Sequence, residues 1–359
     1  MIKDVDFWKG KKVFITGHTG FKGAWLSYVL KLLGAKVYGY SLKPKSRYSF
    51  FELLIMNKGY FEKNIYANIL ELKKIKKEIR KAKPDIVFHL AAQALVRKSY
   101  KNPLETYNVN YIGSLNLMHA CLNQKSIKSI VLITSDKVYE VNKKKVFKET
   151  DRLGGLDPYS ASKASAEIAI SSYASSFFDF KKVGIATVRA GNVIGGGDWG
   201  EDRLIPDIIK SCKNNKFMLV RYPNAIRPWQ HVLEAIFCYL DIARYMYLNK
   251  MNKLMTWNVG VNEHHLSVIK IIKLFQSQFL NFSYKIAKDK KFLETKILQL
   301  SNKKFSQMFK WRPILNMSKT INFTIEWYKI LVDSKIPNLK QITNSQIKFF
   351  LDARSKRYK

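Results

Sequence analysis

Cysteine and acidic side chains are both scarce in this chain of 359 residues. The 3 cysteines are scattered and odd in number, so they form neither a disulfide framework nor a metal-binding pattern, and we expect reduced, buried thiols. No stretch reaches the roughly 20 apolar residues that would span a bilayer. The first ten residues lack the apolar core of a secretion signal. We therefore expect a cytoplasmic protein with no membrane partner.

Aspartate and glutamate number 27 against 63 lysine and arginine residues, which gives a formal net charge of +36. A nucleic-acid-binding protein would gather such charge in one groove or on one helix. The lysines instead run through the whole chain, which favours a lysine-rich surface and predicts no nucleic-acid partner. A positive field would still help to recruit a small anionic substrate.

Internal repeats and Pro/Gly-rich hinges are also missing. The first half of the chain alternates short β-branched apolar segments with longer helical patterns. Strands are expected at residues 12–16, 36–40, 64–68, 85–90, 129–135 and 183–189, and helices at 21–33, 70–81, 103–123 and 159–176. This alternation predicts an α/β fold with a doubly wound, Rossmann-like parallel sheet that is covered on both faces.

Beyond Gly191 the pattern becomes irregular, with loops rich in Gly, Pro and Trp between helices. We expect a smaller, mixed substrate-binding cap there, without a linker to the sheet. The predicted division is a dinucleotide-binding Rossmann domain over residues 1–190, mainly the cap over 191–345 with some returns to the core, and a basic tail of unassigned order over 346–359.

A glycine-rich turn follows the first expected strand directly, with the sequence Gly17-His18-Thr19-Gly20-Phe21-Lys22-Gly23. Glycine permits the tight turn and the close approach of backbone amides to a pyrophosphate, and the helix N-terminus supplies unpaired N–H groups. The turn therefore predicts a dinucleotide site. After the second strand, Leu42-Lys43-Pro44-Lys45 has no carboxylate for the adenosine ribose, so these residues leave NAD and NADP open.

Tyr159 and Lys163 lie four residues apart, on one face of an expected helix. A nearby ammonium favours tyrosinate, so we expect a lowered Tyr159 pKa and a role as a base. Ser135 ends the fifth strand, where ligands bind in such sheets, and can hydrogen-bond the same substrate hydroxyl. Asp136 and Lys137 follow at once and add an acid and a base, which permits a second chemistry beyond alcohol oxidation.

The chain resembles the extended short-chain dehydrogenase/reductases over roughly residues 7–327. The likeness is carried by residues 17–23, 89–93, 134–140, 157–163, 189–199 and 227–232. Within this family, the last two stretches and the Ser-Asp-Lys step look like those of nucleotide-sugar dehydratases that act on a CDP-linked sugar. Sister enzymes typically have a glutamate in place of Lys137.

This resemblance implies a redox-neutral removal of water. Tyr159, with Ser135 and Lys163, would take the proton of the sugar C4 hydroxyl while hydride passes to the cofactor. Lys137 would then remove the C5 proton, Asp136 would protonate the departing C6 hydroxyl, and hydride would return to C6. The resemblance also implies NAD as the cofactor, a CDP-sugar as the substrate, and a homodimer or dimer of dimers.

The same resemblance assigns binding residues and no metal ligands. The implied cofactor-binding residues are Gly17, Thr19, Gly20, Phe21, Lys22, Gly23, Asn68, Ile69, Leu90, Ala91, Ala92, Asn110, Tyr159 and Lys163. The implied substrate-binding residues are Gln93, Asn192, Arg203, Leu204, Pro206, Arg221, Arg227 and Gln230.

Two kinds of alternative stay open. One is another enzyme of similar chemistry, either a 4-epimerase or a dehydratase of a different nucleotide sugar. The other is a catalytically silent dinucleotide-binding protein that uses its charge to bind RNA, with the steep salt dependence of many phosphate contacts.

Overall fold

A seven-stranded parallel sheet forms the centre of the computed structural model, which describes residues 6–56, 58–141, 146–214, 216–261, 266–279, 282–287, 299–334 and 337–357. Its order is β3-β2-β1-β4-β5-β7-β12, and every pair is parallel. The strands are β1 (Lys12–Thr16), β2 (Lys36–Ser41), β3 (Lys63–Tyr66), β4 (Ile86–His89), β5 (Ser129–Ile133), β7 (Gly184–Ala190) and β12 (Met255–Val259). The expected doubly wound sheet is confirmed.

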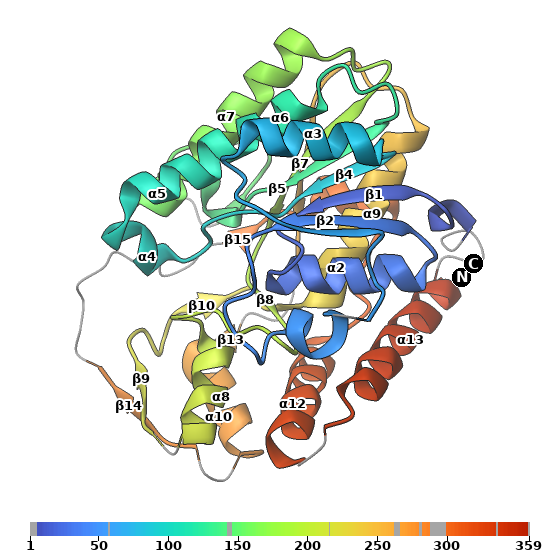
Figure 1. The fold of residues 1–359 in the computed structure, drawn as a ribbon. Helices are drawn as coiled ribbons and strands as arrows, with labels where there is room; N and C mark the ends of the chain where they lie inside the picture. Colours follow the sequence, from blue (N-terminus) through green and yellow to red (C-terminus); the bar gives the residue numbers. More distant parts are fainter. Residues whose placement is uncertain are drawn as a thin grey trace.

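The two faces of the sheet bury two separate apolar cores. Side chains alternate along each strand, so Val13 and Ile15 of β1 face one core and Phe14 faces the other. Helices α2 (Phe21–Leu32) and α9 (Val232–Leu248) pack on the first face, and α3 (Leu72–Ala82), α6 (Gly113–Cys121) and α7 (Pro158–Phe177) cover the second (Figure 1). Burial on both faces explains why the strands are continuously apolar.

Four elements differ from the sequence expectation. The helix expected over residues 103–123 is divided into α5 (Pro103–Tyr107), a π-helical turn η2 (Asn108–Ile112) and α6. A short helix, α4 (Val96–Lys101), follows β4. Strand β12 adds a seventh strand beside β7, and helix α9 crosses from the cap back to the sheet. These last two are returns of the second half of the chain to the core.

A smaller cap lies beside the carboxyl ends of the strands (Figure 1). It contains helices α8 (Leu204–Asn214) and α10 (Val268–Gln276), which contact each other. Two short strand pairs complete it: β9 (Met218–Val220) with β14 (Tyr284–Ile286), and β10 (Ile226–Arg227) with β13 (Leu266–Ser267). The remaining short elements are η1 (Phe51–Ile55), η3 (Asp136–Val138), β6 (Val146–Phe147), β8 (Val193–Ile194), β11 (Gln230–His231), β15 (Gln299–Leu300) and α11 (Lys303–Phe309).

The C-terminal region forms two helices, α12 (Met317–Asp333) and α13 (Leu339–Arg357), which pack against each other. Residues 346–357 of the basic tail are therefore helical. Gln346 Nε2 donates to the Phe323 carbonyl at 2.8 Å, and Arg354 pairs with Asp241 of α9. In the described part of the chain, no helix has both the length and the apolar character needed to cross a membrane.

Candidate active site

A cavity of about 720 Å³ opens between the carboxyl ends of the strands and the cap. The strand order reverses between β1 and β4, and ligands in doubly wound sheets bind at such a point. Most of the residues expected to bind or react line this one space. These are Gly17, Gly20, Phe21, Lys22, Gly23, Leu90, Ala92, Ser135, Asp136, Lys137, Tyr159, Lys163, Asn192, Arg203, Leu204, Pro206, Arg221 and Arg227.

The turn between β1 and α2 fits a dinucleotide pyrophosphate. Gly17 has φ +76°, and a Cβ there would lie 2.5 Å from the Ala91 nitrogen. A Cβ on Gly23 would lie 2.1 Å from the Gly17 carbonyl oxygen. Among the described residues, no side chain caps the α2 N-terminus and no acid stands in its first turn, so its N–H groups are available to an anion.

Two further side chains belong to this turn. Thr19 Oγ1 donates to the Leu42 carbonyl at 2.9 Å and lies 2.9 Å from Ser41 Oγ, which fixes the turn to the end of β2. Lys22 lines the cavity, and burial, followed by the charge of Arg203, lowers its pKa to about 8. A cation beside the glycine turn suits a phosphate group.

Four of the expected binding residues contact other groups of the protein in this structure. Asn110 accepts a hydrogen bond from the Gln93 nitrogen at 2.9 Å and donates to the Gln93 carbonyl at 3.0 Å. Asn68 Oδ1 accepts from the Leu70 nitrogen at 3.0 Å, and Ile69 is buried against Gly113. With Thr19 and Ala91, these residues do not line the cavity among the described ones, and their binding roles stay predictions.

Tyr159 and Lys163 stand at the beginning of α7. Asp157 caps this helix by accepting from the Ser160 nitrogen at 3.0 Å, and Pro158 occupies its first turn, so the start of the helix is fixed. Both functional side chains are buried. Tyr159 lies beside Ser135, whose hydroxyl acts to lower the pKa of the phenol. The start of α7 and the end of β5 therefore lie side by side, as the sequence predicts.

The expected lowering of the Tyr159 pKa is wrong for the protein alone. Burial raises the pKa of Tyr159 to about 12, and the opposing effects of the Ser135 hydrogen bond and of Arg203 are smaller. The pKa of Lys163 falls to about 7, because burial and the charge of Lys22 outweigh the attraction of Glu167. The phenol therefore needs additional positive charge before it can act as a base near neutral pH.

The Ser135-Asp136-Lys137 step forms a tight turn at the end of β5. Ser135 Oγ donates to Asp136 Oδ1 at 3.0 Å and accepts from the Lys137 nitrogen at 3.2 Å. Lys137 Nζ lies 3.5 Å from Asp136 Oδ1 and is about one-third exposed. Asp136 Oδ2 is buried and has no hydrogen-bond partner among the described residues. One carboxylate oxygen is thus free for a ligand.

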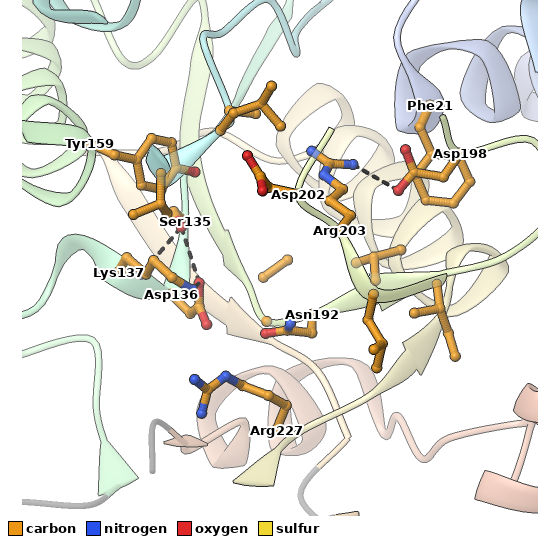
Figure 2. A pocket seen from close by; sticks show the side chains of 18 of the residues that line it. Phe21, Ser135, Asp136, Lys137, Tyr159, Asn192, Asp198, Asp202, Arg203 and Arg227 are labelled. Atoms are coloured by element: carbon orange, nitrogen blue, oxygen red, sulfur yellow. Dashed lines mark hydrogen bonds and ion pairs between the residues drawn. The ribbon is translucent and has the colours of Figure 1, made fainter. Parts of the chain in front are cut away.

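The cap supplies the opposite wall with several guanidinium groups. Figure 2 shows Tyr159 and the Ser-Asp-Lys turn on one side of the cavity, Asn192 and Arg227 below them, and Arg203 across from Tyr159 beside Asp198. Arg203 pairs with Asp198 at 2.8 Å. Arg227 donates to the Ile226 carbonyl at 2.9 Å. Such forks suit a diphosphate.

Gln230 and His231 lie behind this wall. Gln230 is 1% exposed and does not line the cavity within the described residues, so its substrate contact stays a prediction. His231 Nδ1 accepts from the Leu233 nitrogen at 3.3 Å and caps α9. Burial lowers the pKa of His231 to about 3, so it is a neutral core histidine.

Sequence reasoning missed three cavity-lining residues, Arg97, Asp198 and Asp202. Asp202 Oδ1 bridges Arg97 at 3.2 Å and Arg221 at 3.1 Å, which joins α4 to the cap across the cavity mouth. Asp198 stands within the quoted stretch 189–199, and that motif could have identified it. Arg97 had no such signal, because α4 was not expected.

The chain belongs to the NAD dependent epimerase/dehydratase family, whose family model matches residues 13–260. This finding confirms the family expected from the motifs, and with it the NAD cofactor. The chain is 40% identical over 335 residues to a CDP-glucose 4,6-dehydratase of Salmonella typhimurium, with 91% of this chain and 92% of the relative covered. A UDP-glucose 4-epimerase of Mycoplasma genitalium is 27% identical over 74% of this chain and 81% of its own length.

Solved structures share the fold. The NAD complex of dTDP-glucose 4,6-dehydratase from Bacillus anthracis has a TM-score of 0.72 and 18% identity, and covers 88% of this chain and 96% of that one. UDP-glucose-4-epimerase from Stenotrophomonas maltophila has a TM-score of 0.78 and 19% identity, over 89% of this chain and 98% of that one. These likenesses establish the fold but not the substrate.

Proposed function

We propose that this protein removes water from CDP-glucose and forms CDP-4-keto-6-deoxyglucose. The observation that carries the proposal is the placement of the Ser135-Asp136-Lys137 turn beside Tyr159 and Lys163 in one cavity. An epimerase needs only the hydroxyl-oxidising group, whereas elimination needs a further base and acid. The relative with 40% identity over 91% of the chain bears the matching name.

The first step belongs to Tyr159. Its phenol oxygen takes the proton of the sugar C4 hydroxyl, which Ser135 orients through a hydrogen bond. When bound, NAD would supply the reversible hydride carrier for this chemistry. Lys163, one helical turn further along α7, favours the tyrosinate form by its charge.

The second step belongs to the turn after β5. A C4 carbonyl acidifies the C5 hydrogen, and Lys137 Nζ takes that proton. For this step the ammonium of Lys137 passes a proton to the Asp136 carboxylate, 3.5 Å away, which leaves the amine able to accept the C5 proton. Asp136, whose Oδ2 has no hydrogen-bond partner among the described residues, then gives its proton to the departing C6 hydroxyl, which leaves as water. Return of a hydride to C6, with return of the proton held by Lys137 to C5, would then balance the reaction, since the sugar loses one water and no net electrons.

We infer that residues 1–190 mainly hold NAD and that the cap holds the nucleotide diphosphate. Arg221 and Arg227 line the cavity on the cap side, together with Asn192. Guanidinium forks make paired hydrogen bonds to phosphate oxygens, and the cavity lies between the glycine turn and these groups.

We also propose a homodimer or dimer of dimers, formed through α5 and α7, with no nucleic-acid partner. Leu104 of α5 is 78% exposed, and Ile168 and Phe177 of α7 are 58% and 61% exposed. The two helices pack together and present these apolar groups to solvent. Light scattering tests the assembly, with twice or four times the chain mass of 41.8 kDa expected.

A cytoplasmic location fits three buried free thiols.

Mass spectrometry of sugar nucleotides after incubation with protein and NAD tests the activity. CDP-glucose should lose one water without net NADH, and dTDP-glucose and GDP-mannose should stay intact. Loss of water from another nucleotide sugar alone would reassign the substrate.

The variant Lys137→Ala separates dehydration from epimerisation. We expect this variant to oxidise C4 and then stall, because the C5 proton has lost its base. Continued turnover of the variant to an isomer of unchanged mass would instead identify a 4-epimerase. Both outcomes are read by mass spectrometry and by NADH absorbance at 340 nm.

A further inference from the structure

A buried ion pair joins helix α7 to strand β7, close in sequence to the reacting groups on α7. Glu167 is on α7, one turn beyond Lys163, and Arg189 is on β7. Arg189 Nε donates to the two Glu167 oxygens at 2.8 and 2.9 Å, and Arg189 Nη2 donates to Glu167 Oε2. The two side chains are only 4% and 3% exposed. Among the described residues that line the cavity neither Glu167 nor Arg189 occurs, so we infer that neither contacts the substrate.

This pair contacts both ends of the catalytic turn. Thr134, the residue before Ser135, donates its hydroxyl to Glu167 Oε1 at 2.5 Å. At the other end, the Tyr139 hydroxyl oxygen accepts a hydrogen bond from Arg189 Nη1 at 2.7 Å. The Tyr139 hydroxyl in turn donates to Asn258 Oδ1 of β12 at 2.6 Å. Residues 135–137 therefore lie between two anchors that lead to one ion pair.

We propose that Glu167 and Arg189 are positioning residues that set the turn 135–137 against the Tyr159–Lys163 helix. The inference rests on the proposed function, because that reaction requires both groups to act on one sugar in succession. Ser135 comes from β5 and Tyr159 from α7, so their relative placement depends on contacts between these two elements. The ion pair is such a contact, since Glu167 belongs to the same helix as Tyr159.

Energetics favour positioning over stabilisation as the purpose of the pair. Removing two charges from water costs about as much as their attraction returns, so a buried ion pair adds little net stability compared with apolar side chains. Its directional hydrogen bonds instead fix orientation, and small displacements at a reacting centre are costly to rate. The Glu167 charge also acts on Lys163, whose pKa it raises against burial.

The test removes one anchor and leaves the ion pair in place. Thr134→Val loses the hydroxyl bond to Glu167 with little change of shape. Thr187→Val is the matched control, because Thr187 is also buried in the sheet and its hydroxyl lies 2.9 Å from that of Thr256. We expect kcat for CDP-glucose to fall about tenfold in Thr134→Val, with KM within about twofold, and to stay near wild type in Thr187→Val.

Amide hydrogen exchange gives a second readout that needs no substrate. Exchange over residues 135–139 should quicken in Thr134→Val and stay unchanged in Thr187→Val. A kcat loss no larger than that of the control, or unchanged exchange, overturns the proposal. If wild-type protein fails to dehydrate CDP-glucose, the proposed function falls, while the exchange comparison still decides the positioning role.

The pH profile separates positioning from a purely structural role. Glu167→Gln removes the charge that raises the Lys163 pKa, so the alkaline decline of kcat should begin at a lower pH. Thr134→Val keeps that charge and should retain the wild-type alkaline limb. A uniform loss in Glu167→Gln at every pH contradicts the electrostatic part of the proposal.

Discussion

Replacing Asp136 with asparagine should separate the two halves of the reaction. The change keeps the shape of the side chain and its acceptor for Ser135, which donates to Oδ1 at 3.0 Å. It removes the proton that Oδ2 would give to the leaving hydroxyl. General acid catalysis contributes about 10²- to 10⁴-fold, so kcat should fall by that factor, or roughly 3–5 kcal/mol of barrier.

Folding should change much less than rate in this variant. The ion pair with Lys137 spans 3.5 Å and involves a side chain that is about one-third exposed, so its loss costs at most about 1 kcal/mol. The assay is stopped-flow absorbance at 340 nm after mixing with NAD and CDP-glucose. We expect up to one equivalent of NADH to form and persist, because C4 is oxidised and elimination is stalled.

The matched control is Asp202→Asn, which changes another carboxylate of the same cavity that is paired with Arg97 and Arg221. NADH should not accumulate in the control. The reasoning is refuted if Asp136→Asn turns over at the wild-type rate. It is also refuted if that variant loses C4 oxidation and elimination equally, with no NADH signal.

Two further predictions concern the cofactor turn and the pH dependence of folding. Gly23→Ala should abolish NAD binding or folding, because its Cβ would lie 2.1 Å from the Gly17 carbonyl oxygen; calorimetric binding of NAD at wild-type affinity would contradict this. Burial raises the pKa of Glu234 to about 7, above its unfolded value of 4.5. The stability that protonated Glu234 contributes to the folded protein is therefore full below pH 4.5 and is lost as pH rises through 7. That shift corresponds to roughly 3 kcal/mol. In denaturant titrations, Glu234→Gln should therefore gain stability relative to wild type as pH rises from about 5 to about 7.5. A difference in the free energy of unfolding that stays constant over this pH range would contradict the prediction.

The sheet could be read from the sequence because its signal is local. Strands β1, β2, β4, β5 and β7 were expected within about two residues, since each is a short β-branched apolar run between loop residues. Strand β12 was missed because its partner, β7, lies far away in the sequence and only that pairing identifies it. The π-helical turn at residues 108–112 was also missed, because tertiary contacts and not helix propensity decide it.

In the site too, local motifs could be identified from the sequence, whereas properties that depend on tertiary contacts could not. The motifs identified Ser135, Tyr159 and Lys163 correctly as neighbours, because strand carboxyl ends meet at one edge of the sheet. The pKa of Tyr159 could not be predicted, because it depends on burial, which the spacing of residues does not report. Gln93 and Asn110 hydrogen-bond each other in the wall, and no sequence pattern distinguishes such a pair from ligand contacts.

The most direct test of the account uses CDP-glucose that carries deuterium at C4. If Tyr159 starts an oxidation whose hydride returns to C6 in the same site, the product should lack one water and should carry the deuterium at C6. Nuclear magnetic resonance locates the label in the purified product. Product with no deuterium at C6, or recovery of an isomer of unchanged mass, would contradict the proposed dehydration.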